Sequence, residues 1–332
     1  MRYQDLDLST QTILKVIFAG LVLWFLWLVR DIILLLILAL IIASAMEPLV
    51  DYFYAKKVPR ALSVFVVYII VIGLTGLVIY LMIPPVIEQF KVLKANLPAY
   101  TLALQTQFGG LNVQGFLSDL ASGFGGGNVL QSTFGVFNGA LDAIAVIVIS
   151  FYLVAEEKGM KTFVASLLPS HHHEFTMGLI TKIQKKMGGW VLGQLIISFG
   201  IFIFTYIGLL LLHVQYALVL ALVAGLFEIV PYIGPFISAV PAMFIAFVQN
   251  LPPQASLVIW VAVLYLIVHE VEGYVLVPKI MEKTVNISPL LTLVALLIGY
   301  QLAGIIGLVI SIPLATALTV VVQEFWPTKS DQ

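Results

Sequence analysis

The chain has 332 residues, of which 61% are hydrophobic and 10% are charged, and its formal net charge is −1. Soluble domains carry about 25% charged residues, so this composition and a mean hydropathy of +1.09 exclude an ordinary soluble domain. They predict a membrane protein that crosses the bilayer several times. The near-neutral charge gives no electrostatic support for a nucleic-acid partner. The absence of cysteine excludes disulfides, thiolate chemistry and cysteine-based metal sites.

Three apolar segments open the chain, at 14–29, 32–46 and 61–83. The first two are shorter than the about 20 residues that span a bilayer, so we expect flanking residues to extend them. The N-terminus is short and polar and lacks a basic region followed by a cleavage site, which predicts a retained span rather than a signal peptide. The Pro84-Pro85 pair is expected to end the third segment. Residues 1–83 are therefore predicted to form three transmembrane helices.

Residues 84–137 are predicted to form an external amphipathic helical insert. Apolar residues recur there at steps of three and four, as on one face of a helix: Val86, Phe90, Leu93, Leu97, Tyr100, Leu104 and Phe108. We expect this helix to be interrupted or kinked near Pro98. The glycine-rich stretch 123–127 lacks a G-x-G-x-x-G pattern and a following Lys-Ser/Thr pair, so a flexible loop is favoured over a phosphate-binding loop.

Residues 138–189 are predicted to combine a fourth span with a cytoplasmic interfacial helix. The span covers 140–155, and a polar segment with helical periodicity extends from 160 to 187. One face of this segment is apolar, and the other carries the lysines at 182, 185 and 186. Such a helix suits the surface of a membrane with anionic headgroups.

Residues 190–328 are predicted to form a transport core with broken helices. Apolar segments lie at 190–212, 216–227, 236–248, 257–268 and 290–322. The break at 228–235 contains two prolines and a glycine, which interrupt a helix. The last segment is longer than one straight span of about 20 residues, and it is divided by Gly299, Gly304, Gly307 and Pro313. The broken elements 216–250 and 290–322 could each be a re-entrant hairpin or a pair of full spans.

These segments together predict an all-α polytopic membrane protein with about eight membrane segments, broken or re-entrant helices in the C-terminal half, and an extramembrane amphipathic insert. Basic residues concentrate in the loops at 56–60, 156–187 and 279–286. Because such loops stay in the cytoplasm, we expect both termini inside and residues 86–137 outside. The expected location is the cell (inner) membrane.

Glu228 is the residue that most directly indicates function. It carries the only formal charge between Lys186 and Glu270, and an ionised group in hydrocarbon costs roughly 2.5–3.5 kcal/mol on insertion scales. The helix-breaking residues Pro231, Gly234 and Pro235 follow it directly. Broken membrane helices with a polar group at the break form substrate or ion sites in many secondary transporters. The carboxylate is therefore a candidate carrier of a proton or cation; a cap for a half-helix, accepting hydrogen bonds from backbone N–H groups freed at the break, is the structural alternative.

Other polar residues extend the candidate site. His269, Glu270 and Glu272 end an apolar run, and on a helix 269 and 272 are one turn apart and can touch. This cluster could instead anchor the helix end at the membrane interface. Gln194 and Gln301 could line a polar path, although hydrogen bonds between helices would explain them equally well.

Three motifs resemble the autoinducer-2 exporter family of membrane transporters. They are Glu228 followed by Pro231-Tyr232-Ile233-Gly234-Pro235, Glu270 followed by Pro278-Lys279-Ile280, and Gly304-x-x-Gly307 followed by Pro313. The resemblance covers nearly the whole chain in layout and implies secondary transport. Some members of that family are linked to export of the furanone autoinducer-2 and others to sodium(lithium)/proton antiport, so the resemblance leaves the substrate open.

The features together predict a secondary transporter that exports a small polar solute, of the autoinducer-2 kind that the resemblance implies, coupled to ion or proton movement. Sodium(lithium)/proton antiport is the alternative, and a channel or a structural membrane protein is less favoured. No G-x-x-x-x-G-K-[ST], G-x-S-x-G or H-E-x-x-H motif occurs, so we expect neither ATP-driven transport by this chain alone nor an enzyme.

Cofactors and metals are not expected. The triplet at 171–173 is all histidine, but adjacent side chains on a helix point in different directions, which favours solvated interfacial histidines over a metal site. The expected partners are the lipid bilayer, a small-molecule or ion substrate, and further copies of the chain. A homo-oligomer is expected because the apolar stripe over 86–108 needs a surface that covers it.

Overall fold

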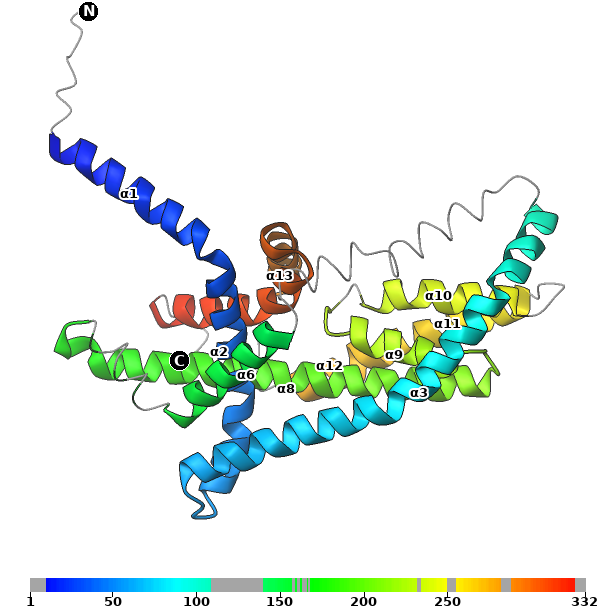
Figure 1. The fold of residues 1–332 in the computed structure, drawn as a ribbon, viewed down its shortest axis with the longest axis horizontal. Coiled ribbons are helices and arrows are strands. Elements are labelled where there is room, and N and C mark those ends of the chain that lie inside the picture. The colour runs from blue at the N-terminus through cyan, green and yellow to red at the C-terminus, as the bar shows by residue number, and fades with distance from the viewer. Residues whose placement is uncertain are drawn as a thin grey trace, which may run out of the picture.

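The computed structural model describes residues 10–108, 140–156, 168–231, 234–249, 255–281 and 288–325, with single residues at 159, 162 and 166. Within these ranges the secondary structure is helical and contains no strand. The elements, labelled as in Figure 1, are α1 (Thr10–Leu28), α2 (Arg30–Tyr54), α3 (Arg60–Phe108), α6 (Ala140–Ala155), η1 (Ser170–His172), α8 (His173–Leu211), α9 (Ala217–Phe227), α10 (Gly234–Val248), α11 (Ala255–Val271), η2 (Glu272–Leu276), α12 (Val277–Met281) and α13 (Pro289–Phe325).

Several helices are long and apolar enough to cross a membrane. Five such segments occur in the described ranges: Arg30–Tyr54, Arg60–Gln89, Ser170–Leu211, Ser256–Met281 and Pro289–Phe325. Shorter apolar helices cover Ile17–Leu28, Leu141–Ala155, Ala217–Phe227 and Gly234–Val248. Large apolar side chains such as Phe18 and Trp24 are exposed on the outside of the bundle, where lipid replaces water. The predicted all-α polytopic membrane fold is therefore confirmed.

The helix α3 continues where the sequence predicted an end. It runs from Arg60 to Phe108 with Pro84, Pro85 and Pro98 inside it, so the predicted stop at Pro84-Pro85 is wrong. A proline removes one backbone hydrogen bond and can bend a helix without ending it. The far half of α3 packs against α9 and α10, and these contacts offset the cost of the prolines.

Part of the predicted insert lies outside the described residues. This holds for 109–137, including the glycine-rich stretch 123–127, and for the stripe side chains of Phe90, Leu93, Leu97, Tyr100, Leu104 and Phe108. The described member of the stripe, Val86, packs against the apolar cluster formed by α9, α10 and α11. The start of the stripe thus has a partner within the same chain.

The helix α8 joins two segments that the sequence analysis treated separately. It is continuous from His173 to Leu211, so the interfacial helix ending near 187 and the span starting at 190 form one element. Gly188 lies against the backbone of Ser44 in α2, where an added Cβ would clash with the Ser44 carbonyl. The glycine therefore permits close contact between α2 and α8 rather than a break in α8. In Figure 1 α8 is the long green helix, and it packs against α2, α9, α11 and α13.

The first predicted break is present in the structure. α9 ends at Phe227, α10 begins at Gly234, and the two short helices pack against each other. Pro231 lies between them, and a Cβ on Gly234 would meet the carbonyl of Phe227. The predicted break residues Tyr232 and Ile233 lie outside the described residues.

The second predicted break is present in α13. The backbone leaves helical geometry at Ala303 (φ −143°, ψ 22°) and Gly304 (φ 59°, ψ −137°), and a positive φ of this kind favours glycine. Gly299 before the turn and Gly307 after it lie face to face, so that a Cβ on either would clash with the carbonyl of the other. Pro313 lies inside the second half without ending it. Figure 1 shows the two halves, brown and red, meeting at this turn.

Candidate functional site

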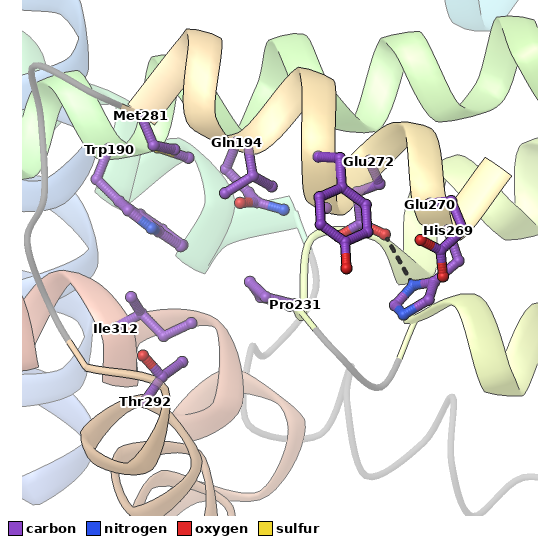
Figure 2. Close-up of a pocket in the computed structure, with 12 residues that line it drawn as sticks. Trp190, Gln194, Pro231, His269, Glu270, Glu272, Met281, Thr292 and Ile312 are labelled. Atoms are coloured by element: carbon purple, nitrogen blue, oxygen red, sulfur yellow. Dashed lines mark ion pairs between the residues drawn. The ribbon is translucent and has the colours of Figure 1, made fainter. Parts of the chain in front are cut away.

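A cavity of about 430 Å³ lies where both broken elements meet α8 and α11 (Figure 2). Its walls come from α8, the break after α9, the end of α11 with η2 and α12, and both halves of α13. The lining residues are Trp190, Gln194, Pro231, His269, Glu270, Glu272, Gly273, Tyr274, Val277, Met281, Thr292 and Ile312.

Five of the candidate site residues from the sequence line this cavity: Gln194, Pro231, His269, Glu270 and Glu272. Glu228, Gly234 and Pro235 are buried, and Glu228 adjoins the cavity through its contacts with Gln194 and Glu272. Gln301 is exposed, two residues before the turn in α13, and does not line the cavity. The structure thus brings together the residues of two separate sequence clusters.

Glu228 is fully buried at the C-terminal end of α9. Its main chain is held in place: the N–H donates to the carbonyl of Ala224, and the carbonyl accepts a hydrogen bond of 2.5 Å from Nε2 of Gln194. Among the described residues, its carboxyl oxygens have no hydrogen-bond partner other than the neighbouring Glu272 carboxyl group. The backbone N–H and carbonyl of Glu228 are therefore both hydrogen-bonded without use of its side chain, which remains available to bind a proton or cation.

The Glu228 carboxyl group lies close enough to that of Glu272 for the two to interact electrostatically. Oε2 of Glu272 is in turn 3.5 Å from Nδ1 of His269, so the expected approach of 269 and 272 is seen, and Figure 2 marks this pair with a dashed line. Side-chain exposure rises from 9% at Glu272 to 40% at His269. The three groups therefore form a row that leads from the buried break toward the open part of the cavity.

A π-helix positions Glu272. The five residues Glu272–Leu276 form this element directly after α11, and single π turns inside α-helices are frequent at functional sites because they shift the register of the side chains. The next residue, Gly273, has no side chain, and a Cβ there would meet nothing within 4 Å. The sequence contained no clear signal for this change of helix type.

The sequence analysis missed seven of the lining residues: Trp190, Gly273, Tyr274, Val277, Met281, Thr292 and Ile312. Trp190 is one helical turn before Gln194 on α8 and is buried, so the i, i+4 spacing from Gln194 could have indicated it. Thr292 and Ile312 come from opposite halves of α13, and no local pattern distinguishes them from other apolar or hydroxyl residues. Figure 2 shows them facing Trp190 across the cavity.

The charged side chains that line the cavity are mainly acidic. Glu270 and Glu272 contribute carboxylates and no lysine or arginine is among the residues that line it. Within the described ranges, no group of three or more histidine and acidic residues is placed to hold a metal ion. The arrangement can therefore bind a proton or a small cation at its acidic end and a neutral polar molecule against Trp190, Gln194 and Thr292.

Two broken helical elements that meet at a polar cavity inside an apolar bundle are an arrangement found among membrane transporters. The sequence profile of the AI-2E family transporter matches residues 13–326. The chain belongs to this family, and the resemblance drawn from its motifs is confirmed.

Curated relatives match most of the chain. YrrI of Bacillus subtilis is 28% identical over 318 residues, covering 90% of this chain and 88% of its own. YueF of the same organism is 28% identical over 282 residues, covering 78% of this chain and 74% of its own. YhhT of Escherichia coli K12 is 27% identical over 300 residues, covering 86% of this chain and 82% of its own. Their names describe them only as transport proteins, which supports a membrane transporter and leaves the substrate open.

Proposed function

We propose that the protein is a secondary transporter that exports a small polar solute, of the autoinducer-2 kind, coupled to a proton or monovalent cation bound by Glu228 and Glu272. The observation that carries this proposal is a fully buried carboxyl group whose one neighbouring polar side chain among the described residues is a second carboxyl group, Glu272, on the cavity wall.

The carboxylate pair needs a positive ligand. Two carboxylates in contact repel each other when both are ionised, and one shared proton or one bound cation removes this repulsion. The lining supplies no lysine or arginine that could do so instead, and its one histidine, His269, lies beside Glu272 and would itself have to bind a proton to become positive. The pair sits at a helix break inside the bundle, with Glu228 fully buried and Glu272 on the cavity wall, so an ion enters and leaves it through the cavity. Opening the cavity to one side of the membrane at a time would link ion release to a change of conformation.

The remainder of the cavity suits a small polar solute. Its volume of about 430 Å³ lies in the range of about 300–1,000 Å³ for small-molecule sites. The indole of Trp190 offers a flat apolar face, and Gln194 and Thr292 offer neutral polar groups. Membership of the AI-2E family supports autoinducer-2 as the first solute to test.

Sodium(lithium)/proton antiport is the second candidate function. It is favoured by the same acidic pair, since carboxylate oxygens are ligands for both protons and hard cations. In that case the ion that competes with the proton is itself the substrate, and the neutral part of the cavity binds no exported solute.

Transport in proteoliposomes with a pH-sensitive dye inside tests the proposal. The wild type is expected to move autoinducer-2 and protons together under an imposed pH gradient. Glu228→Gln keeps the shape of the side chain but cannot ionise, and it is expected to reduce coupled flux to the level of empty liposomes. Glu88→Gln, at an exposed glutamate on α3, is the matched control and should transport like the wild type.

The outcomes separate the candidates. Coupled flux that Glu228→Gln leaves unchanged would refute the role of the acidic pair. Proton movement that requires sodium or lithium but no solute would identify the antiporter. An ion conductance without coupling to protons or solute would identify a channel.

A further inference from the structure

The two ring nitrogens of His269 have different surroundings. Nδ1 is 3.5 Å from Oε2 of Glu272, and both of these atoms are buried. The side chain as a whole is 40% exposed and lines the cavity. In Figure 2 the second ring nitrogen points away from Glu272. The imidazole therefore contacts a buried carboxyl group through Nδ1, while its exposed part lies in the cavity.

The ring of His269 lies where the first break meets the π-helix. His269 is in the last turn of α11, and Glu272 begins η2 directly after it. From the other side, the ring of Phe236 lies 6.0 Å from the imidazole, centroid to centroid. Phe236 belongs to the first turn of α10, which starts at Gly234 after the break. A shift of α10 relative to α11 would therefore move the imidazole with respect to Glu272.

A proton from the cavity reaches Glu228 by way of Glu272. Glu228 is fully buried, and its carboxyl group neighbours that of Glu272. The side chain of Glu272 is only 9% exposed, so water has little direct access to it. His269 is more exposed and lies beside it. Imidazole accepts and donates protons near neutral pH, which makes histidine the usual side chain for passing protons on.

The other titratable groups around the imidazole are acidic or phenolic. Glu270, Glu272 and Tyr274 line the cavity with it, and Glu228 lies behind Glu272. No lysine or arginine is among the lining residues, so no fixed positive charge repels a protonated imidazole there. Carboxylates close by stabilise the charged ring.

We propose that His269 is the proton relay of the acidic pair, taking a proton from water in the cavity and passing it through Nδ1 to Glu272, from which it reaches Glu228. This relay deepens the proposed function, on which its role in transport rests. Proton transfer to Glu272, in contrast, can be measured without transport.

The transfer conserves protons and charge at each step. Nε2 of the neutral ring binds a proton from water, and the imidazolium then donates its Nδ1–H to the Glu272 carboxylate. The Nδ1–H bond breaks and an O–H bond forms, so the ring is neutral again with its proton on Nε2. The distance of 3.5 Å shortens for this step, as acid–base contacts do when the reacting state forms. A turn of the half-exposed ring that brings Nδ1 to the water lets the tautomer reset.

Time-resolved infrared spectroscopy after a pH jump tests the transfer in purified protein. The C=O stretch of a protonated carboxyl group that is missing in Glu228→Gln and in Glu272→Gln reports on the pair. His269→Ala is expected to slow the rise of this band by about a hundredfold, the lower end of what a positioned acid–base group contributes. His172→Ala, at an exposed histidine in η1, is the matched control and should keep the wild-type rate.

Rescue by free imidazole separates a relay from a structural role. Imidazole in the buffer should enter the space left in His269→Ala and speed the rise of the band in proportion to its concentration, without effect on the wild type. His269→Gln keeps a polar side chain beside Glu272 but cannot carry a proton to it, so it should be as slow as His269→Ala and resist rescue. A wild-type rate in His269→Ala, or a slow rate that imidazole does not raise, would overturn the relay.

Flux in proteoliposomes then tests the role in transport. His269→Ala is expected to lower proton-coupled flux while the solute KM stays unchanged, because the relay delivers protons and holds no solute. Failure of the proposed function gives a different pattern: Glu228→Gln would leave coupled flux unchanged, and the infrared rates would still decide the relay. Proton-coupled flux at the wild-type level in His269→Ala would overturn the transport role of the relay.

Discussion

At Glu228 the main chain and the side chain have separate surroundings. Gln194 holds the carbonyl and Ala224 accepts from the N–H, so the helix end is complete without the carboxylate. The carboxylate instead faces Glu272, which a π turn brings to the same place from the end of α11. This geometry is why we treat the two acids as one ion-binding unit.

Glu272→Gln is expected to abolish ion-coupled transport as fully as Glu228→Gln does. Residues that act as one unit are not additive, so the double variant should lose no more than either single variant. Glu270→Gln is the comparison, because Glu270 lines the cavity but is exposed; it should change the solute KM and keep the coupling. Dye-reported proton flux in matched proteoliposomes measures all four proteins. Additive losses from 228 and 272 would show that they act independently.

At the scale of the elements, both breaks depend on glycine at the point of closest approach. In α13 the positive φ of Gly304 turns the chain, and Gly299 and Gly307 let the two halves touch through their backbones. The turn brings Thr292 and Ile312, from opposite halves of α13, to the same cavity. The site therefore depends on glycines that do not themselves line it.

Gly307→Ala is expected to destabilise the protein by about 1–3 kcal/mol, the usual cost of overpacking a filled interface. The added Cβ would clash with the Gly299 carbonyl and force the halves of α13 apart. Gly73→Ala in α3 is the control, because a Cβ there meets nothing within 4 Å. Thermal unfolding in detergent should show a lower midpoint for Gly307→Ala than for the wild type. The midpoint of Gly73→Ala should be unchanged. A wild-type midpoint for Gly307→Ala would mean that the two halves of α13 can separate at this contact without loss of stability.

The far half of α3 ties the N-terminal helices to the α9–α10 hairpin. Oε1 of Gln89 accepts a hydrogen bond of 3.3 Å from the N–H of Val219, and Nδ2 of Asn96 donates one of 3.2 Å to the hydroxyl of Tyr216. The first bond satisfies a backbone N–H in the first turn of α9, where such groups lack a partner within their own helix. The second holds the side chain of Tyr216, the residue directly before α9.

Replacing both side chains, as Gln89→Leu with Asn96→Ala, is expected to loosen the start of α9. Each bond contributes about 0.5–1.5 kcal/mol, so hydrogen exchange at residues 217–220 should be faster by roughly tenfold in the double variant. Lys91→Ala, at an exposed position of α3, should leave exchange unchanged. Unaltered exchange in the double variant would show that apolar packing, including that of Val86, is sufficient to hold the contact.

At the scale of the whole molecule, we propose that lysine-rich loops lie in the cytoplasm, as the charge distribution predicts. Single cysteines at Lys56 and at Gly110 should then label from opposite sides of the membrane. In intact cells an impermeant maleimide is expected to modify Gly110→Cys and to spare Lys56→Cys until the membrane is opened. Labelling of position 56 from outside, without labelling at 110, would invert the orientation.

We also propose that the protein works as a homo-oligomer. In Figure 1 α1 contacts α2 and extends away from the other helices, and its side chains, such as Leu23 and Trp27, are largely exposed. A second copy would cover this surface more specifically than lipid does. Native mass measurement in mild detergent should therefore show a discrete oligomer. A monomer at every concentration would count against the proposal.

Local chemistry explains what the sequence by itself determined. Apolar segment length and low charge predict a polytopic helical membrane protein, because backbone groups in lipid must bond within helices. Proline and glycine predict the breaks after Glu228 and near Gly304, because their effects on the backbone act at their own positions. The motifs around these breaks were sufficient to recognise the family that the profile match confirms.

Contacts between distant residues decided the rest. Only the packed structure shows that Glu228 and Glu272 meet, that Trp190 and Thr292 share their cavity, and that Gln301 does not. Helix ends depended on packing too: α3 passes through Pro84-Pro85 because its far half has partners on α9 and α10. A single residue type cannot encode these outcomes, since each requires two surfaces that are far apart in the chain to fit together.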